Sequence, residues 1–166
     1  KETRGDLMGW VAPGKAGGAL QDYAERLDEL ILQMSESCPS LAAAGLMRDK
    51  AMVTCYPGNG TRYVRHVDNS NSANRTRVVT CILYLNPGWR EADGGHLRLH
   101  FQNEKVDLKP LHNRLAMFWS DRRAPHEVLP AHTSRCAVSF WYHNEAAVRE
   151  VHREEEERQE GGPITG

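Results

Sequence analysis

The 166-residue sequence has little of several features that mark particular classes of protein. Its net charge is only −1, so no global field would attract nucleic acid or an anionic lipid surface. It contains no apolar run near the ~20 residues of a membrane-spanning helix. The first residues, Lys1 to Asp6, lack the apolar segment of a signal peptide. We therefore expect neither a nucleic-acid partner nor a membrane partner, and a protein that works as a monomer.

Cysteine is also scarce, and its spacing is uninformative for metal binding. The four cysteines are Cys38, Cys55, Cys81 and Cys136, and no two of them form a C-x-x-C pair. The last three lie inside apolar segments rich in residues that favour β-strands. Buried free thiols in a reducing compartment are the simplest interpretation. This predicts a location in the cytosol or the nucleus.

The remaining composition, 40% apolar and 26% charged residues, is ordinary for one globular domain. Apolar residues recur at helical spacing over 18–37, and Pro39 ends that pattern. Short β-rich segments separated by Gly, Pro and Asn turns follow: 51–56, 63–67, 77–85, 96–101, 114–119 and 135–142. After Asn144 a charged helix is expected.

This pattern predicts a mainly β protein with flanking helices, a jelly roll of the cupin-like type. The single domain, 1–166, would comprise an N-terminal helical support (1–43), a core (about 44–144) and a charged C-terminal helix (145–166).

His66-Val67-Asp68 has the spacing of two metal ligands. On an extended strand, residues i and i+2 point to the same side, so both side chains could contact one ion. His126, in a later β-rich segment, could complete a two-histidine, one-carboxylate site with an open face, which suits non-haem Fe(II). The H-x-[DE] pattern alone is weak, since it recurs twice near the C-terminus, and an ordinary structural histidine is the alternative for His66.

Arg135 opens an apolar strand, where an unpaired buried charge would be costly. Its planar guanidinium suits the distal carboxylate of a dicarboxylate such as 2-oxoglutarate. A salt bridge to an acid of the protein itself would serve equally well, and the residue pattern leaves both interpretations open.

Motifs across nearly the whole chain give a more specific indication. The informative segments are Arg4-Gly5-Asp6 through Trp10, KAMVTCYPGNGTRYVRHVDN (50–69), VTCILYLN (79–86), GGHLRL (94–99), FWSDRRAPHEVLPA (118–131) and SRCAVSFWY (134–142). They resemble the oxygen-sensing prolyl hydroxylases of the hypoxia-inducible factor type. This group includes protist relatives that modify an adaptor of cullin ubiquitin ligases.

The resemblance implies a double-stranded β-helix and an enzyme that uses Fe(II), 2-oxoglutarate and O2, with ascorbate as a reductant. It implies iron ligands at His66, Asp68 and His126, and a clamp for 2-oxoglutarate at Arg135 and Tyr84. Further positions that match the co-substrate pocket are Met52, Tyr56, Thr80, Ile82, Leu97, Val128 and Trp141. Positions that match the entrance for the substrate proline are Arg4, Asp6, Tyr63, Arg77 and Trp141, with Asp6 and Arg77 matching a pair that ties the entrance together.

The resemblance thus implies a prolyl 4-hydroxylase and oxygen sensor that acts on a cytosolic regulatory protein, either a ubiquitin-ligase adaptor or a protein like the hypoxia-inducible factor. The segment 69–79 is longer than in the animal members and the acidic tail differs, which favours the adaptor. A 2-oxoglutarate dioxygenase acting on another protein or a small molecule is the alternative. Three other functions fit the sequence less well. A zinc hydrolase would leave Arg135, Tyr84 and Tyr56 unexplained, and a non-enzymatic binding module would not need three metal ligands. Collagen-type prolyl hydroxylases bind the co-substrate with a lysine, whereas this sequence has Arg135.

Overall fold

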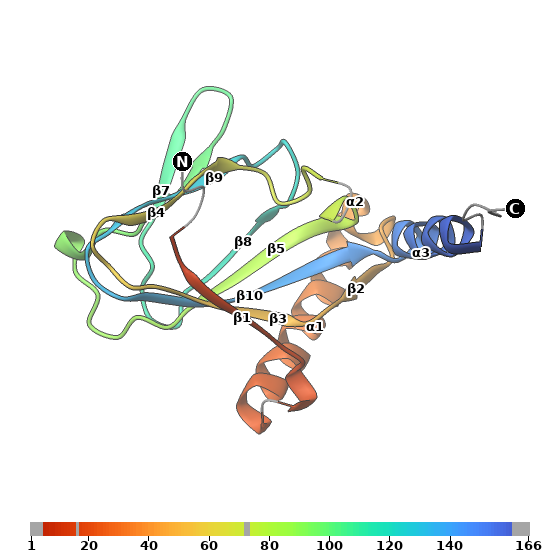
Figure 1. Cartoon of the computed structure of the whole chain (residues 1–166), viewed down its shortest axis with the longest axis horizontal. Coiled ribbons are helices and arrows are strands. Elements are labelled where there is room, and N and C mark those ends of the chain that lie inside the picture. Colours follow the sequence, from red (N-terminus) through yellow and green to blue (C-terminus); the bar gives the residue numbers. More distant parts are fainter. Residues whose placement is uncertain (1–4, 16, 72–73, 161–166) are drawn as a thin grey trace, which may run out of the picture.

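Two antiparallel β-sheets face each other in the computed structural model, which describes residues 5–15, 17–71 and 74–160 (Figure 1). Arg4 lies outside these residues, so its predicted contact with substrate is not described. The larger sheet has the order β1 (Leu7–Val11), β3 (Ala51–Tyr56), β10 (Arg135–Asn144), β5 (Arg77–Tyr84) and β8 (Leu115–Trp119), with β2 (Leu46–Arg48) paired to β10. The smaller sheet has the order β4 (Thr61–His66), β9 (His126–Ala131), β6 (Leu97–His100) and β7 (Lys105–Leu108). This is the predicted jelly-roll architecture.

The helix α1 (Gly18–Ser37) covers one face of the larger sheet and agrees with the predicted range. Its apolar stripe buries Ala24, Leu27 and Ile31 in the same cluster as Phe140 of β10. Burial of each large side chain contributes about 1.5–3 kcal/mol, so this face supplies much of the stability of the sheet. Pro39 follows α1 and occupies the first turn of a short helix, α2 (Pro39–Ala42), where proline is favoured.

The charged C-terminal helix is α3 (Glu145–Glu160), as predicted. Short 3-10 helices occur at Pro13–Lys15 and Glu91–Asp93. Among the described residues, no helix is long and apolar enough to cross a membrane.

Four strands were not predicted from the sequence: β1, β2, β7 and β9. β1 lies in the segment expected to be helical, has mostly exposed side chains, and forms because its backbone pairs with β3. β9 contains Pro130 and polar residues, which lowers its local β-propensity, and it is held between β4 and β6. Tertiary pairing therefore determines these strands more than local sequence does.

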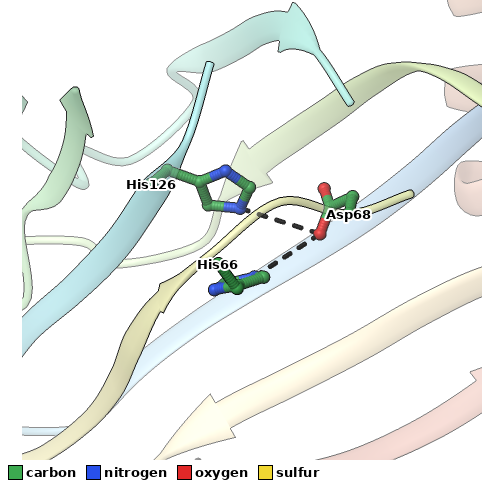
Figure 2. A group of neighbouring side chains, drawn as sticks. All are labelled: His66, Asp68 and His126. Atoms are coloured by element: carbon green, nitrogen blue, oxygen red, sulfur yellow. Dashed lines mark ion pairs between the residues drawn. The ribbon is translucent and has the colours of Figure 1, made fainter. Parts of the chain in front are cut away.

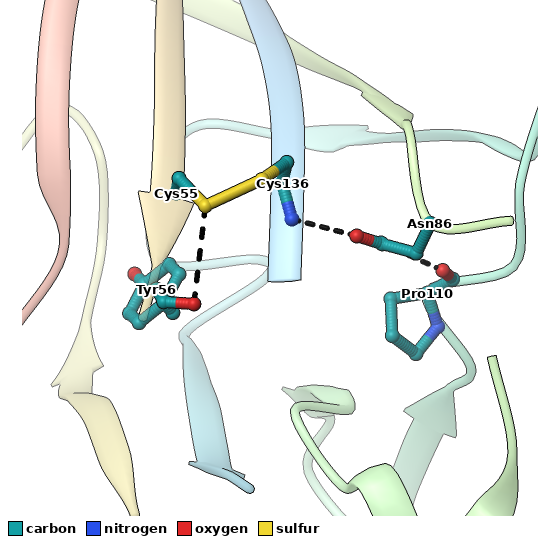
Figure 3. The surroundings of a disulfide bond; sticks show 5 residues. All are labelled: Cys55, Tyr56, Asn86, Pro110 and Cys136. Atoms are coloured by element: carbon teal, nitrogen blue, oxygen red, sulfur yellow. Dashed lines mark hydrogen bonds between the residues drawn. A yellow bond between two sulfur atoms is a disulfide. The ribbon is translucent and has the colours of Figure 1, made fainter. Parts of the chain in front are cut away.

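Cys55 and Cys136 lie opposite each other on β3 and β10 and form a disulfide (Figure 3). The prediction of four free thiols is therefore wrong for this pair, whereas Cys38 and Cys81 are free. Asn86 forms hydrogen bonds beside the disulfide. Its side-chain oxygen accepts a hydrogen bond from the Cys136 N–H (2.6 Å), and its side-chain amide donates one to the Pro110 carbonyl (2.9 Å). The cytosolic or nuclear location stays a prediction, without the cysteine argument that supported it.

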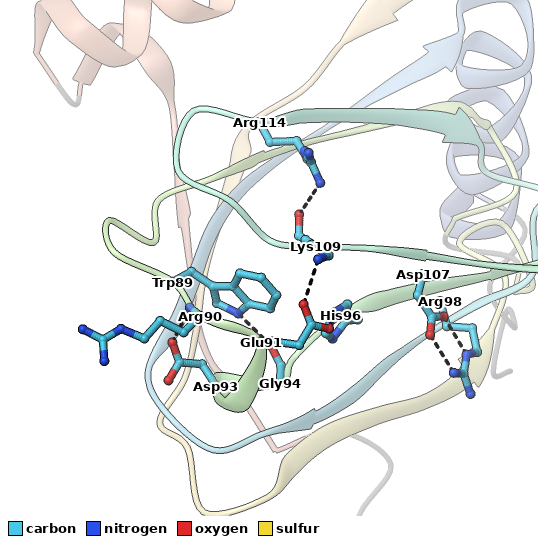
Figure 4. A network of polar contacts seen from close by, with 10 residues as sticks. All are labelled: Trp89, Arg90, Glu91, Asp93, Gly94, His96, Arg98, Asp107, Lys109 and Arg114. Carbon is cyan, nitrogen blue, oxygen red and sulfur yellow. Dashed lines mark hydrogen bonds and ion pairs between the residues drawn. The ribbon is translucent and has the colours of Figure 1, made fainter.

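A polar network fixes the segment that leads into β6 (Figure 4). The Glu91 carboxylate contacts the imidazole of His96 (3.0 Å) and the ammonium group of Lys109 (2.8 Å). The Trp89 indole N–H donates to the Gly94 carbonyl (2.9 Å). These contacts hold the Gly94-Gly95 turn in place, and this turn bears directly on the candidate site.

Candidate active site

The three predicted metal ligands come together at one end of the two sheets (Figure 2). His66 is the last residue of β4 and His126 the first of β9, and the two are direct cross-strand partners. One ligand atom from each of His66, Asp68 and His126 lies within 4.8 Å of the others. The expectation that His66 and Asp68 share one strand is wrong, because β4 ends at His66. Asp68 lies in the turn that follows, and this turn directs its carboxylate toward the two histidines.

Hydrogen bonds set the tautomer of both histidines. Nδ1 of His66 lies 2.8 Å from the Val64 carbonyl, and Nδ1 of His126 lies 3.0 Å from the Ala124 carbonyl. A carbonyl can only accept, so each Nδ1 carries a proton and each Nε2 presents a lone pair when the ring is neutral. Both Nε2 atoms face Oδ1 of Asp68, at 3.5 and 3.7 Å. This donor set fits a divalent metal ion bound between the three atoms.

The second oxygen of Asp68 is held away from that centre. Oδ2 accepts hydrogen bonds from the Thr80 hydroxyl (2.6 Å) and the Trp141 indole (3.1 Å). Burial would raise the pKa of Asp68, but the contact with His66, the nearby His126 and the hydrogen bonds from Thr80 and Trp141 together lower it. Burial is also the main cause that lowers the pKa of His126. Both shifts favour the metal-binding forms, an ionised carboxylate and a neutral imidazole.

A cavity of about 250 Å³ opens beside the three ligands and reaches Arg135. Arg135 is only 4% exposed, and its guanidinium lies 5.1 Å from the ring centres of both Tyr56 and Tyr84. The Tyr84 hydroxyl is fully buried, and among the described residues no hydrogen bond of ordinary geometry reaches it. Burial raises its pKa, more than the nearby Arg135 lowers it, so the hydroxyl stays protonated and can donate. A buried guanidinium beside such a hydroxyl fits a carboxylate of a bound dicarboxylate.

The Arg135 side chain needs space that a glycine provides. Gly95 has φ +71°, and a Cβ there would lie 2.8 Å from Cδ of Arg135. Its carbonyl accepts from Nε of Arg135 at 2.6 Å. The Gly94-Gly95 turn therefore makes room for the guanidinium and orients it.

Most of the predicted pocket residues line this cavity, whereas Tyr84 is not among its lining residues and reaches it only as a neighbour of Arg135. The predicted residues that line it are Met52, Tyr56, Tyr63, Arg77, Thr80, Ile82, Leu97, Val128, Arg135 and Trp141. Sequence reasoning missed Met8 and Trp10 of β1, and also Thr54, Val67, Ala137 and Ser139. Ser70, Asn71 and Asn74, which line the cavity too, belong to the 69–79 segment that the sequence already marks as a determinant of the substrate. Strand alternation could have identified Ala137 and Ser139, which lie between Arg135 and Trp141 at two-residue spacing.

Aromatic and cationic side chains surround the entrance. The Tyr63 ring stacks on His66 at 3.9 Å, and the Arg77 guanidinium lies 3.9 Å from the ring centre of Trp141. The loop after Asp68 contacts the cavity and is tied to α3 by an ion pair between Arg75 and Glu154 (2.6 Å). The pairing of Asp6 with Arg77 stays a prediction.

Comparison with known proteins identifies the family. The family model described as "2OG-Fe(II) oxygenase superfamily" matches residues 51–143, the segment that contains all three ligands and Arg135. The chain belongs to this superfamily. Membership implies Fe(II), 2-oxoglutarate and O2 as metal and co-substrates.

The relatives of the chain are prolyl hydroxylases, which confirms the resemblance seen in the sequence. The chain is 45% identical over 147 residues to "Egl nine homolog 1" of Rattus norvegicus, covering 86% of this chain and 42% of that protein. It thus spans less than half the length of this relative. A prolyl hydroxylase of Trichoplax adhaerens, solved with a peptide of the hypoxia-inducible factor oxygen degradation domain, matches with a TM-score of 0.75, 41% identity, and 86% and 64% coverage. A prolyl-4-hydroxylase of Pseudomonas putida matches with a TM-score of 0.75, 33% identity, and 86% and 73% coverage.

Proposed function

We propose that this chain is a prolyl 4-hydroxylase that oxidises a proline of a regulatory protein and acts as an oxygen sensor. The carrying observation is the convergence of the His66, Asp68 and His126 ligand atoms, within 4.8 Å, on a cavity that also contains Arg135. A metal site and a dicarboxylate site that share one small cavity are what a 2-oxoglutarate oxygenase requires.

In this proposal His66, Asp68 and His126 would hold Fe(II), which would supply the O2-dependent oxidation of 2-oxoglutarate and of the prolyl ring. Arg135 binds the distal carboxylate of 2-oxoglutarate, and the buried Tyr84 hydroxyl donates to the same group. Ile82, Leu97 and Val128 provide apolar walls that keep water from the reacting atoms. Ascorbate is proposed as the reductant that maintains the iron.

The substrate proline is proposed to enter past Tyr63, Arg77 and Trp141. The similarity to the Trichoplax enzyme, solved with a hypoxia-inducible factor peptide, supports a protein substrate with an extended proline segment. A ubiquitin-ligase adaptor, the substrate that the sequence resemblance favours, is the other candidate.

The test is incubation of the Fe(II)-loaded protein with 2-oxoglutarate, ascorbate and proline peptides from both candidate substrates. Mass spectrometry should find one added oxygen atom on a proline of one peptide, with matching succinate. The Asp68→Ala protein is the control and should form neither product.

Succinate formation in the wild-type protein without oxidation of either peptide would indicate a different substrate, such as another protein or a small molecule. Absence of any Fe(II)-dependent succinate formation would contradict the proposed reaction itself.

A further inference from the structure

Ser120 is a buried polar residue that contacts two elements of the proposed metal site without facing the cavity. It follows directly after β8 and is 0% exposed. Its backbone N–H donates to the Val78 carbonyl of β5 (2.9 Å), and its carbonyl accepts from the N–H of Asn69 (3.1 Å), the residue after Asp68. Ser120 therefore anchors the turn that carries the Asp68 carboxylate.

Its side chain reaches the same carboxylate through Thr80. The Ser120 and Thr80 hydroxyl oxygens lie 2.9 Å apart, and the Thr80 hydroxyl donates to Oδ2 of Asp68 at 2.6 Å. Thr80 has a single hydroxyl proton, and an ionised carboxylate can only accept. The Thr80 proton is therefore committed to Asp68, and Ser120 must be the donor in its bond with Thr80.

We propose that Ser120 is a positioning residue whose hydroxyl acts through Thr80 to hold Oδ2 of Asp68 away from the metal and leave Oδ1 as the ligand atom. The bond from Ser120 removes the alternative rotamers of the Thr80 hydroxyl and strengthens its donation to Asp68. Thr80 lines the cavity, as the resemblance implied, and in this proposal its hydroxyl also orients a metal ligand. This inference rests on the proposed metal site.

The test measures Co(II) affinity of the metal-free full chain by the visible absorption of bound Co(II), so it does not depend on turnover. Thr80→Val removes the direct bond to Asp68 and should weaken Co(II) binding about 10-fold or more. Ser120→Ala should weaken it about 2- to 10-fold, the share of one neutral hydrogen bond. Ser35→Ala is the matched control, because the Ser35 hydroxyl donates to the Ile31 carbonyl within α1 (2.8 Å). The Co(II) affinity of this variant should match that of the wild type.

A double-mutant cycle distinguishes action through Thr80 from a merely structural role. If the relay exists, adding Ser120→Ala to Thr80→Val should change the Co(II) affinity by less than about twofold. Thr80→Ser, which keeps the hydroxyl, should bind Co(II) nearly as well as the wild type. The rise in melting temperature on Co(II) addition should also be smaller for Ser120→Ala than for Ser35→Ala.

Wild-type Co(II) affinity in Ser120→Ala or in Thr80→Val, or fully additive effects in the cycle, would overturn the inference while leaving the metal site intact. Failure of the wild-type protein to bind Co(II) more tightly than Asp68→Ala would instead overturn the proposed function. Circular dichroism of each variant identifies any that fail to fold. If Ser120→Ala is one of them, Ser120→Cys, which keeps the size but offers only a weak donor, takes its place in the titration and in the cycle with the same expected results.

Discussion

The two faces of β10 have different tasks, although the same ten residues build both. Arg135, Ala137, Ser139 and Trp141 line the cavity, whereas Val138, Phe140 and Tyr142 pack in the cluster beneath α1. Successive side chains of a strand point to opposite sides, so this division follows from the period of the strand. The same alternation separates Thr80 and Ile82 of β5 from Val79 and Cys81.

The two faces also differ in their energetic roles. The α1 face buries apolar side chains, a term that favours folding. The cavity face buries Arg135 and, through Trp141, contacts the buried Asp68 of the turn after β4. Desolvation of these two charges opposes folding unless other groups pair with them. We therefore expect changes on the cavity face to remove function with little loss of stability, and changes on the α1 face to do the reverse.

The largest effect is expected from removal of a metal ligand. Asp68→Ala should abolish 2-oxoglutarate turnover because the cavity then retains only two of the three ligand atoms, while the sheets lose no apolar packing. Succinate assays with parallel thermal melts check this. His126→Ala should behave in the same way, and a variant of either kind with near wild-type turnover would remove that residue from the proposed site.

The opposite face should give the largest loss of stability. Phe140→Ala should lower the free energy of unfolding by about 3–5 kcal/mol, because Phe140 is fully buried beneath α1. Ser139→Ala, one residue away on the cavity face, should cost no more than about 1 kcal/mol. Urea unfolding measures both, and equal losses would contradict the division between the faces.

A smaller and more specific effect is expected at the co-substrate end. Arg135→Lys keeps a positive charge but loses the planar fork, so the KM for 2-oxoglutarate should rise with little change in stability. Tyr84→Phe should raise it more mildly, by about 2- to 10-fold for one hydrogen bond. Steady-state kinetics at varied 2-oxoglutarate decide, and an unchanged KM in both variants would place the dicarboxylate elsewhere.

The smallest effect concerns Asp28 of α1, whose carboxylate accepts from Arg48 (2.9 and 2.8 Å) and from the Tyr142 hydroxyl (2.5 Å). Burial opposes ionisation of Asp28, but these bonds lower its pKa. A carboxyl group whose pKa is lower in the folded state than in the unfolded state adds to the free energy of unfolding. This added stability is complete above the pKa of an ordinary carboxyl group, about 4, and it is lost as the pH falls through the folded-state pKa.

Asp28→Asn should therefore lower stability by about 1 kcal/mol at neutral pH, after allowance for solvent screening. The difference from the wild type should shrink as pH drops below about 4, and urea unfolding across pH measures it. A difference that grows in acid would have the wrong sign for this account.

Sequence patterns predicted the parts of the fold that local residues determine. Helical spacing gave α1 to the residue, and β-branched segments gave β3 and β5 closely. β1 and β9 were missed because their pairing with distant strands, rather than their own propensities, makes them strands. The Cys55–Cys136 disulfide was missed for the same reason, since only the register of β3 against β10 brings the two together.

The residues of the candidate site could be predicted where they belong to a sequence motif. They could not be predicted where they reach the site only because the fold brings distant segments together. His66, Asp68, His126 and Arg135 could be named from the sequence, but no spacing indicates that Gly95 makes room for Arg135. Arg123 pairs with Asp121 (2.7 Å) and its guanidinium stacks on Trp119, contacts that the sequence motif around it does not specify. The hydroxyls of Thr80 and Ser120 lie on neighbouring parts of the larger sheet, and only their register reveals their link to Asp68.

The most direct test is titration of 2-oxoglutarate into the Fe(II)-loaded protein without O2, followed by visible absorption. If His66, Asp68 and His126 hold Fe(II) beside Arg135, a charge-transfer band should grow to saturation in the wild type. The band should require more 2-oxoglutarate in Arg135→Lys, be absent in Asp68→Ala, and be unchanged in Ser35→Ala. A wild-type protein that gives no band, or an Asp68→Ala protein that gives the same band, would contradict a shared site for the metal and the co-substrate.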